Sequence, residues 1–473
     1  MLNYKELGLR IGLEIHREMN THKLFCQCPS ILSDETDFEI KRRLHSVKSE
    51  LGEEDIVAKY EMNKNKYAIY KWNKKLACLV ETDEEPPHEV NKEALITALI
   101  TSKLLNCKII DEIQFMRKQV LDLSNTSGFQ RTGLISIKGF IETSKGRVNI
   151  ETVCLEEDSA RKIKNEEDYV IYNLDRLGIP LIEIATDSSI KDPEHAKEVA
   201  EYLGMVLKST GRFKSGIGSI RQDVNVSIKG HPRVELKGFQ DLRRIPKTVD
   251  NEIHRQLENL KSKREIKSEV RKVEPDFSST YLRPMPTGSR MYPETDIPPV
   301  KITKELLSEI KIPELITEKA VNIEKKYNLN PVLAREILKL NIPFDYYAEK
   351  YSINPNLIAE VLIEIPKELK SRFNVDPKKI SGKDFEFVFE HLESKAINRE
   401  AVKDILLDIA QGKHIDLNKY KQLDTKEIEN KLKEIIAKNK GASFSALMGE
   451  AMKEFKGKVS GKQISDLLNK LLK

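Results

Sequence analysis

Residues 219–228 read SIRQDVNVSI and carry the clearest alternation of polar and apolar side chains in the chain. If this stretch is a strand, its polar members share one side: Arg221, Asp223, Asn225 and Ser227. The residues between them are mostly apolar and would pack on a core. The polar face either floors a binding site or meets water, and Glu235 and Lys237 in the following VELKG extend the same two interpretations.

Short β-branched stretches with this alternation recur between residues 4 and 235, separated by helical stretches such as residues 195–209. We therefore expect an α+β domain built on a large, mostly antiparallel sheet. Residues 271–300 are rich in Pro, Gly and Ser, which excludes a regular helix or a central strand. That stretch is either a linker or a functional loop.

Amphipathic segments of helix length follow residue 302, and a second helical piece begins near Asp416. The α+β domain is thus followed by all-helical domains. The sequence predicts three domains: residues 1–300, residues 301–415 and a helical tail of residues 416–473.

The composition is that of a cytoplasmic enzyme or an RNA-associated protein, with 39% hydrophobic and 33% charged residues among 473. No stretch approaches the roughly 20 apolar residues of a membrane span. Five cysteines are a sparse, odd number, which favours a reducing compartment over a disulfide framework. Residues 417–473 hold 13 lysines against 7 acids, which suits contact with nucleic-acid phosphates or, with equal weight, a solvated helical face.

Three short motifs place acids where a cation would stabilise them. In GLEIH, Glu14 and His16 point to the same side of the predicted strand and can share a metal ion, although an exposed polar face explains them too. ETVCLEED ends in three adjacent acids, residues 156–158, which repel one another without a cation. In GIPLIEIATD, Glu183 interrupts an apolar strand, and a buried carboxylate is unfavourable unless it is paired or metal-bound.

The cysteines suggest a metal site of a different kind. Cys26 and Cys28 in LFCQCPS, with Cys78 further along the chain, supply three of the four ligands that structural zinc requires. No fourth ligand is evident, so free thiols remain the alternative. Cys107 and Cys154 lie in apolar segments, where a small buried residue is the expected role.

Common catalytic motifs are absent from the sequence. It contains no G-x-x-x-x-G-K-[ST], no G-x-G-x-x-G after a strand and no G-x-S-x-G. Any use of ATP therefore occurs outside a P-loop or dinucleotide-binding frame, and nothing indicates a hydrolase nucleophile.

Read in order, the motifs resemble the GatB/GatE family, the B-type and E-type subunits of glutamyl-tRNA amidotransferases. The blocks are GLEIH, LFCQCPS, CLVETDEEPPHE, SNTSGFQRT, LEED, LDRLGIPLIEIATD, IRQDVNVSI, VELKG and RMYPETDIPP, and they span nearly the whole chain. SNTSGFQRT and RMYPETDIPP look like the archaeal GatE type. One departure is that GatE proteins carry an insertion resembling an aspartyl-tRNA synthetase domain before RMYPETD, where this chain has only SSTYLRPMPTGS.

The resemblance implies a cradle-shaped first domain in which ATP and Mg²⁺ phosphorylate the γ-carboxylate of glutamate on tRNA(Gln), after which ammonia displaces phosphate. The family's metal-binding positions match His16, Glu157 and Glu183, with Glu14 beside them and Glu156 as a competitor for Glu157. The residues assigned by strand geometry to positioning nucleotide or acyl group are Arg221, Asp223, Asn225, Glu235 and Lys237.

The resemblance also implies partners, because no ammonia-releasing nucleophile is recognisable here. For the GatE type the partner is the asparaginase-like GatD protein; for the GatB type it is the amidase GatA together with the small GatC protein. The helical tail is similar to the family's tRNA-binding tail. Two alternatives are a catalytically inactive tRNA-binding protein of the same fold and a metal-dependent hydrolase, for which no pocket is identifiable from the sequence.

Overall fold

The structure is a computed structural model that forms two compact units, Met1–Leu315 and Ile316–Lys473. Each unit is described by itself. The described residues are 2–45, 52, 56–120, 122–216, 218–262, 266–286, 291–340, 342–420, 425–439, 441–455, 459 and 461–472.

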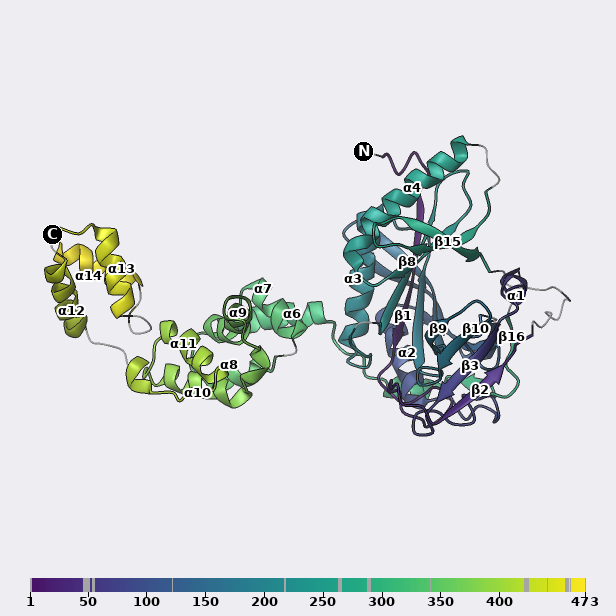
Figure 1. Ribbon diagram of the computed structural model, residues 1–473, viewed down its shortest axis with the longest axis horizontal. Coiled ribbons are helices and arrows are strands. Elements are labelled where there is room, and N and C mark those ends of the chain that lie inside the picture. The colour runs from purple at the N-terminus through teal and green to yellow at the C-terminus, as the bar shows by residue number, and fades with distance from the viewer. Residues whose placement is uncertain are drawn as a thin grey trace. The chain divides into compact units, whose positions relative to one another are not determined.

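An 11-stranded sheet dominates the first unit (Figure 1). Its order is β15 (Ser279–Pro284), β14 (Glu269–Val273), β13 (Val234–Phe239), β12 (Ile220–Ser227), β1 (Arg10–Glu18), β11 (Pro180–Thr186), β8 (Gly146–Glu157), β7 (Phe129–Thr143), β6 (Phe115–Gln119) and β16 (Met291–Pro293), with β4 (Lys108–Ile109) on β7. Only β13 and β14 pair in parallel among the described strands of this sheet. The α+β class with a mostly antiparallel sheet is therefore confirmed.

One face of the sheet is apolar because alternate residues of each strand point toward the helices. On β1 these are Ile11, Leu13 and Ile15, all at most 1% exposed. Helices α2 (Lys92–Leu104), α3 (Pro193–Ser209) and α4 (Ile245–Lys261) contact this sheet, and α1 (Ile56–Met62) contacts its edge strand β15. Since β1 lies at the centre of the sheet, Glu14 and His16 emerge in the middle of the opposite, polar face.

The Pro-rich stretch of residues 271–300 supplies both edges of the sheet. β15 forms one edge and β16 the other, as expected for a segment that cannot lie centrally. Nine strand spacings separate these edges, about 43 Å in a flat sheet, yet only seven residue steps join Pro284 to Met291, at most about 25 Å. The sheet must therefore curve strongly around its polar face.

A smaller sheet adjoins this curve, in the order β2 (Phe38–Arg42), β3 (Tyr67–Trp72), β10 (Tyr169–Asn173) and β9 (Arg161–Asn165). Its own core includes the buried Tyr70 and Tyr172, whose rings stack at 6.2 Å. The remaining elements of the first unit are β5 (Glu112–Ile113), η1 (Leu242–Arg244), β17 (Val300–Lys301) and α5 (Lys304–Glu309).

The second unit is helical and contains two separate apolar clusters. The first is formed from α6 (Ile316–Tyr327), α7 (Pro331–Lys339), α8 (Phe344–Lys350), α9 (Pro355–Phe373), η3 (Pro377–Lys379), α10 (Gly382–Glu393), α11 (Arg399–Ala410) and η4 (Leu417–Tyr420). The second is formed from α12 (Thr425–Lys438), α13 (Phe444–Glu454) and α14 (Gly461–Leu471). The division at residues 300 and 415 stays a proposal beside these observations. Among the described helices, none has the length and apolar character needed to cross a membrane.

Candidate active site

A cavity of about 1140 Å³ opens on the polar face of the curved sheet. Its wall includes seven of the residues singled out from the sequence: Glu14, His16, Glu183, Arg221, Asp223, Glu235 and Lys237. They come from β1, β11, β12 and β13, four strands that are neighbours in the sheet although distant in the chain. Strand pairing thus gathers the polar faces of these motifs at one place.

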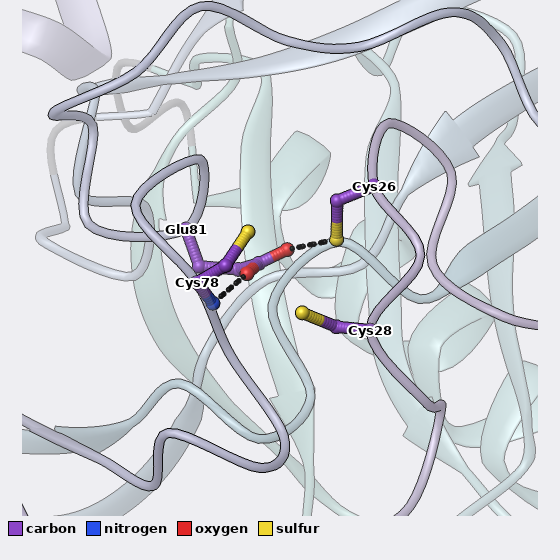
Figure 2. Close-up of side chains that lie close together, drawn as sticks. All are labelled: Cys26, Cys28, Cys78 and Glu81. Atoms are coloured by element: carbon purple, nitrogen blue, oxygen red, sulfur yellow. Dashed lines mark hydrogen bonds between the residues drawn. The ribbon is translucent and has the colours of Figure 1, made fainter.

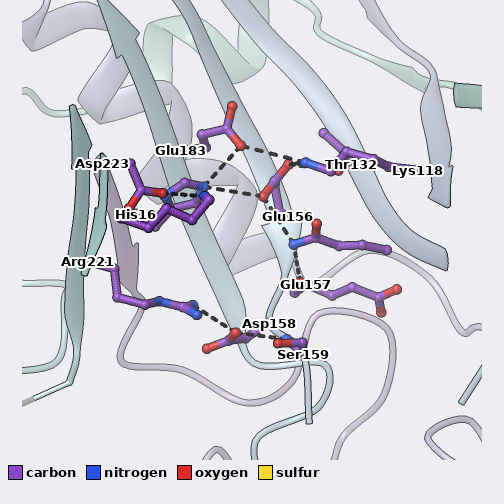
Figure 3. A network of polar contacts seen from close by, with 12 residues as sticks. His16, Lys118, Thr132, Glu156, Glu157, Asp158, Ser159, Glu183, Arg221 and Asp223 are labelled. Atoms are coloured by element: carbon purple, nitrogen blue, oxygen red, sulfur yellow. Dashed lines mark hydrogen bonds and ion pairs between the residues drawn. The ribbon is translucent and has the colours of Figure 1, made fainter. Parts of the chain in front are cut away.

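His16 and Glu183 lie opposite each other on β1 and β11, with His16 Nε2 at 3.1 Å from Glu183 Oε2 (Figure 3). Glu156, from β8, brings Oε2 to 4.0 Å from the same imidazole nitrogen. One ligand atom from each of the three residues lies within 4.8 Å of the others. Two carboxylates and an imidazole at this spacing fit a divalent cation such as Mg²⁺.

Lys118 of β6 completes this cluster with a positive charge. Its Nζ lies 2.5 Å from Glu156 Oε1 and 3.7 Å from Glu183 Oε2. Burial raises the pKa of Glu183, but Lys118 and His16 outweigh burial and lower that pKa well below its ordinary value. Burial opposes protonation of His16, yet the hydrogen bond to Glu183 and the charges of Glu183 and Glu156 raise the pKa of His16. The carboxylate of Glu183 is thus held ionised, as a metal ligand must be.

Glu157 is not part of this cluster, contrary to the expectation from the resemblance. Adjacent residues of a strand point to opposite faces, so Glu156 meets His16 and Glu157 turns away (Figure 3). Its carboxylate accepts the backbone N–H of Arg131 at 2.9 Å, and Arg131 Nε donates to Glu294 at 2.8 Å. Burial raises the pKa of Glu157 despite Arg131. Of the two acids that the sequence left in competition, Glu156 is the one that lies beside His16 and Glu183.

A second carboxylate cluster lies beside the first, formed by Glu14, Asp223 and Glu235. Lys237 Nζ lies 2.6 Å from Asp223 Oδ2 and 2.5 Å from Glu235 Oε1. Asn225 donates its amide to Glu14 Oε1 at 3.0 Å. Burial, followed by the charges of Glu235 and Glu183, raises the pKa of Glu14. These five predicted residues therefore form one polar network.

The side chain of Arg221 is held by Asp158, a buried acid that was singled out from the sequence only as one of the three adjacent acids at residues 156–158. Arg221 Nη2 donates to Asp158 Oδ1 at 2.8 Å, and Asp158 is 1% exposed. Asp158 also lies 3.6 Å from Arg176 Nε. Asp158 therefore orients Arg221 along the cavity wall.

The cysteine motif forms a separate cluster, away from the polar network. Cys26, Cys28, Cys78 and Glu81 each bring one sulfur or carboxylate oxygen within 4.8 Å of the others (Figure 2). Cys26 Sγ donates to Glu81 Oε1 at 2.9 Å, and the backbone N–H of Cys78 donates to Glu81 Oε2 at 2.7 Å. Hydrogen bonds from Cys26 and Cys28 lower the pKa of Cys78. Three sulfurs and one oxygen at this spacing fit tetrahedral zinc.

Two family models match the chain over most of its length. Residues 9–308 match the GatB/GatE catalytic domain, and residues 343–472 match the GatB domain. The chain belongs to the GatB/GatE family. The membership expected from its motifs is confirmed, and both carboxylate clusters fall within the part matched to the catalytic domain.

Several archaeal members of the GatB/GatE family are similar to the chain from end to end. The E subunit of glutamyl-tRNA(Gln) amidotransferase from Archaeoglobus fulgidus is 35% identical, covering 100% of the chain and 99% of that relative. The proteins of the same name from Methanosarcina acetivorans and Methanocaldococcus jannaschii are 33% and 35% identical, with coverage of at least 98% on both sides. The first alignment spans 616 positions whereas the chain has 473 residues, so at least 143 positions face a gap in this chain.

Sequence reasoning missed Lys118, Glu81 and the preference for Glu156. Lys118 reaches the site only because β6 pairs with β7 and β7 with β8, which no local pattern reveals. Glu81 carried a signal, since it follows Cys78 by three residues in CLVE, the spacing of paired zinc ligands.

Proposed function

We propose that this chain is the subunit of a tRNA-dependent amidotransferase that binds tRNA(Gln) mischarged with glutamate and activates the glutamate for conversion to Gln-tRNA(Gln). The observation that carries the proposal is the His16, Glu156 and Glu183 cluster facing a large cavity inside a domain of the GatB/GatE family. Such a protein is a carbon–nitrogen ligase with glutamine or asparagine as amide donor. Its relatives carry the matching name.

In the proposed reaction, a γ-carboxylate oxygen of tRNA-bound glutamate takes the terminal phosphoryl group of ATP and ADP leaves; ammonia then attacks the acyl carbon and displaces phosphate. Mg²⁺ would be held by His16, Glu156 and Glu183, and it supplies charge neutralisation for the phosphoryl groups. Lys118 lies beside Glu156 and provides a further positive charge at the site.

The neighbouring network has the role of positioning. Lys237, held between Asp223 and Glu235, and Arg221, held by Asp158, present fixed cations to the cavity. Glu14 and Asn225 fix one another on adjacent strands. We propose that these side chains orient nucleotide and glutamyl group relative to the metal-binding cluster.

Ammonia is proposed to come from a partner, the asparaginase-like GatD protein, with the amidase GatA and the small GatC protein as the alternative pair. The motifs SNTSGFQRT and RMYPETDIPP and the names of the relatives favour the GatE type, for which the resemblance implies GatD as partner. A location in the cytoplasm is part of the proposal.

The helices α12, α13 and α14 are proposed to bind tRNA. They have their own apolar cluster, and the sequence from residue 417 to 473 carries 13 lysines against 7 acids. Positive charge on a separate helical core suits recognition of the RNA backbone.

Zinc is proposed as a structural ion at Cys26, Cys28, Cys78 and Glu81. All four protein ligands are present, so the ion would have no open position for a substrate. A stabilising role for the loop that carries Cys26 and Cys28 follows.

The deciding experiment is a transamidation assay on Glu-tRNA(Gln) with ATP, Mg²⁺ and asparagine, using this chain together with an asparaginase-like partner. Gln-tRNA(Gln) should form only when ATP and both proteins are present. Product only with an amidase partner and glutamine would move the chain to the GatB type. No product with either partner would refute the proposed activity.

A further inference from the structure

Arg233 and Arg283 are two of the four arginines on the cavity wall, together with Arg43 and Arg221. Arg283 lies on β15, and Arg233 directly precedes β13. β14 separates these two strands, and the register places Arg283 level with Glu235, two residues from Arg233, so the two backbones are about 12 Å apart, a gap that two extended arginine side chains can bridge. Both residues lie toward the edge of the sheet that β15 forms.

Arg233 and Arg283, like the exposed Arg43 on the same wall, lack the acid partners that Arg221 and Arg131 have among the described residues. Arg221 pairs with Asp158, and Arg131 pairs with Glu157 and Glu294. The guanidinium groups of Arg233 and Arg283 have no ion pair or hydrogen bond among the residues that the structure describes. The Nη1 atom of Arg283 is shielded from solvent and yet has no acceptor within the described part of the chain. A shielded guanidinium N–H without an acceptor is unfavourable, so an anionic ligand would stabilise it.

The distribution of charge along the cavity wall indicates where an anionic ligand would bind. Acids lie on the wall from β8 to β13, namely Glu156, Glu183, Asp223 and Glu235, and Arg233 and Arg283 add positive charge at the start of β13 and on β15. A ligand with phosphate groups can therefore meet metal-binding carboxylates at one end and guanidinium groups at the other. Planar guanidinium groups match the oxygens of a phosphate and bind them in pairs.

We propose that Arg233 and Arg283 form a phosphate-binding subsite of the cavity. The inference rests on the proposed function, because that function supplies two phosphate-bearing ligands: the triphosphate of ATP and the phosphodiester next to the glutamylated end of the tRNA. Both sources share one chemistry, and binding measurements on each ligand separate them.

The test measures the binding of ATP and of Glu-tRNA(Gln) to the full chain, separately and without turnover. The variants are Arg233→Gln, Arg283→Gln and the double variant. The double variant should bind one of the two ligands about 10- to 100-fold more weakly than the wild type does. Loss of ATP affinity, with tripolyphosphate no longer competing, assigns the subsite to the nucleotide. Loss of tRNA affinity with ATP affinity intact assigns it to the RNA.

The matched control is Arg147→Gln, which removes the same charge from an exposed arginine that pairs with Glu142 outside the cavity. It should change either affinity less than about twofold, as expected for a surface pair. Arg283→Lys keeps the charge and should recover part of the affinity, which a mere loss of folding would not allow. Unchanged affinity for both ligands in the folded double variant would overturn the subsite. A wild-type chain that binds both ligands but forms no Gln-tRNA(Gln) would instead refute the proposed function.

Discussion

At the scale of single residues, Glu183 shows how the sheet tolerates charge in its centre. Its neighbours Ile182 and Ile184 are fully buried, whereas its own carboxylate turns to the cavity and meets His16 and Lys118. A carboxylate at such a place is stable because the charge of Lys118 and the hydrogen bond with His16 offset its loss of hydration.

We predict that Glu183→Gln lowers glutamate activation by about 100-fold or more, because the amide keeps the shape but loses the charge that holds a cation. Binding of tRNA should change less than about twofold, since the basic helical tail is untouched. The two measurements are phosphate release from ATP in the presence of Glu-tRNA(Gln) and filter binding of the tRNA. Glu151→Gln, an exposed acid on β8, is the control. Equal loss of activation and binding would contradict the assignment.

We predict one zinc ion per purified chain, with almost none retained by Cys78→Ala. Because metal binding and folding are coupled, this variant should melt about 5–10 °C lower than the wild type. Elemental analysis and thermal melting measure the two effects. Cys107→Ser, a thiol outside the cluster, should retain its zinc. A zinc-free wild type that melts like its chelator-treated form would show that the thiols are simply buried.

Several of these residues could be chosen from the sequence because strand alternation and charge inside apolar runs are local properties. Glu14, His16 and Glu183 were found in that way. The choice between Glu156 and Glu157 could not be made, since it depends on which face of β8 meets β11, and that pairing is set far away in the chain. The carboxylate of Glu157 instead accepts a hydrogen bond from the backbone N–H of Arg131.

At the scale of elements, the tip of the β7–β8 hairpin is fastened to the start of α3 by His195. The backbone N–H of Lys191 donates to His195 Nδ1 at 3.1 Å, so the proton resides on Nε2 and is donated to Thr143 Oγ1 at 2.8 Å. Burial lowers the pKa of His195. The neutral ring is therefore the form that connects the two elements.

We predict a loss of stability at acidic pH from this contact. A lowered folded-state pKa means that the unfolded chain binds the proton more readily, so stabilisation is complete above the unfolded pKa of about 6.5 and is lost as the pH falls below it. Melting temperatures of the wild type and His195→Asn between pH 5 and 8 test this. The wild type should lose more stability toward pH 5 than the variant does. Parallel curves would show that His195 contributes nothing to the pH dependence.

The sequence predicted that these strands exist, but it did not predict which strands pair with one another. Period-two alternation predicts strands, and the Pro content of residues 271–300 predicts that they avoid the centre of a sheet. That this one stretch forms both edges could not be foreseen, because edge identity depends on contacts across the whole domain.

At the scale of the whole molecule, catalysis and RNA binding are assigned to different units with separate apolar cores. The candidate metal-binding clusters lie in Met1–Leu315, and the basic tail lies in Ile316–Lys473. Each can therefore be altered with the other left folded.

We predict that a chain ending at Asp416 binds Glu-tRNA(Gln) about 10-fold or more weakly and shows a shallower dependence of affinity on salt, because fewer phosphates are contacted. Its KM for the tRNA should rise while ATP binding is preserved. Titrations at several salt concentrations measure both quantities. Unchanged tRNA affinity would refute the role of the tail.

Only seven residue steps separate Pro284, at the end of β15, from Met291, at the start of β16, so the chain joins the two edges of the sheet over a short length. These two strand ends cannot separate by more than about 25 Å unless β15 or β16 loses its pairing with the neighbouring strand. A longer connection between Pro284 and Met291 would let the two edge strands move further apart, while the cluster on β1, β8 and β11 at the centre of the sheet would stay unchanged.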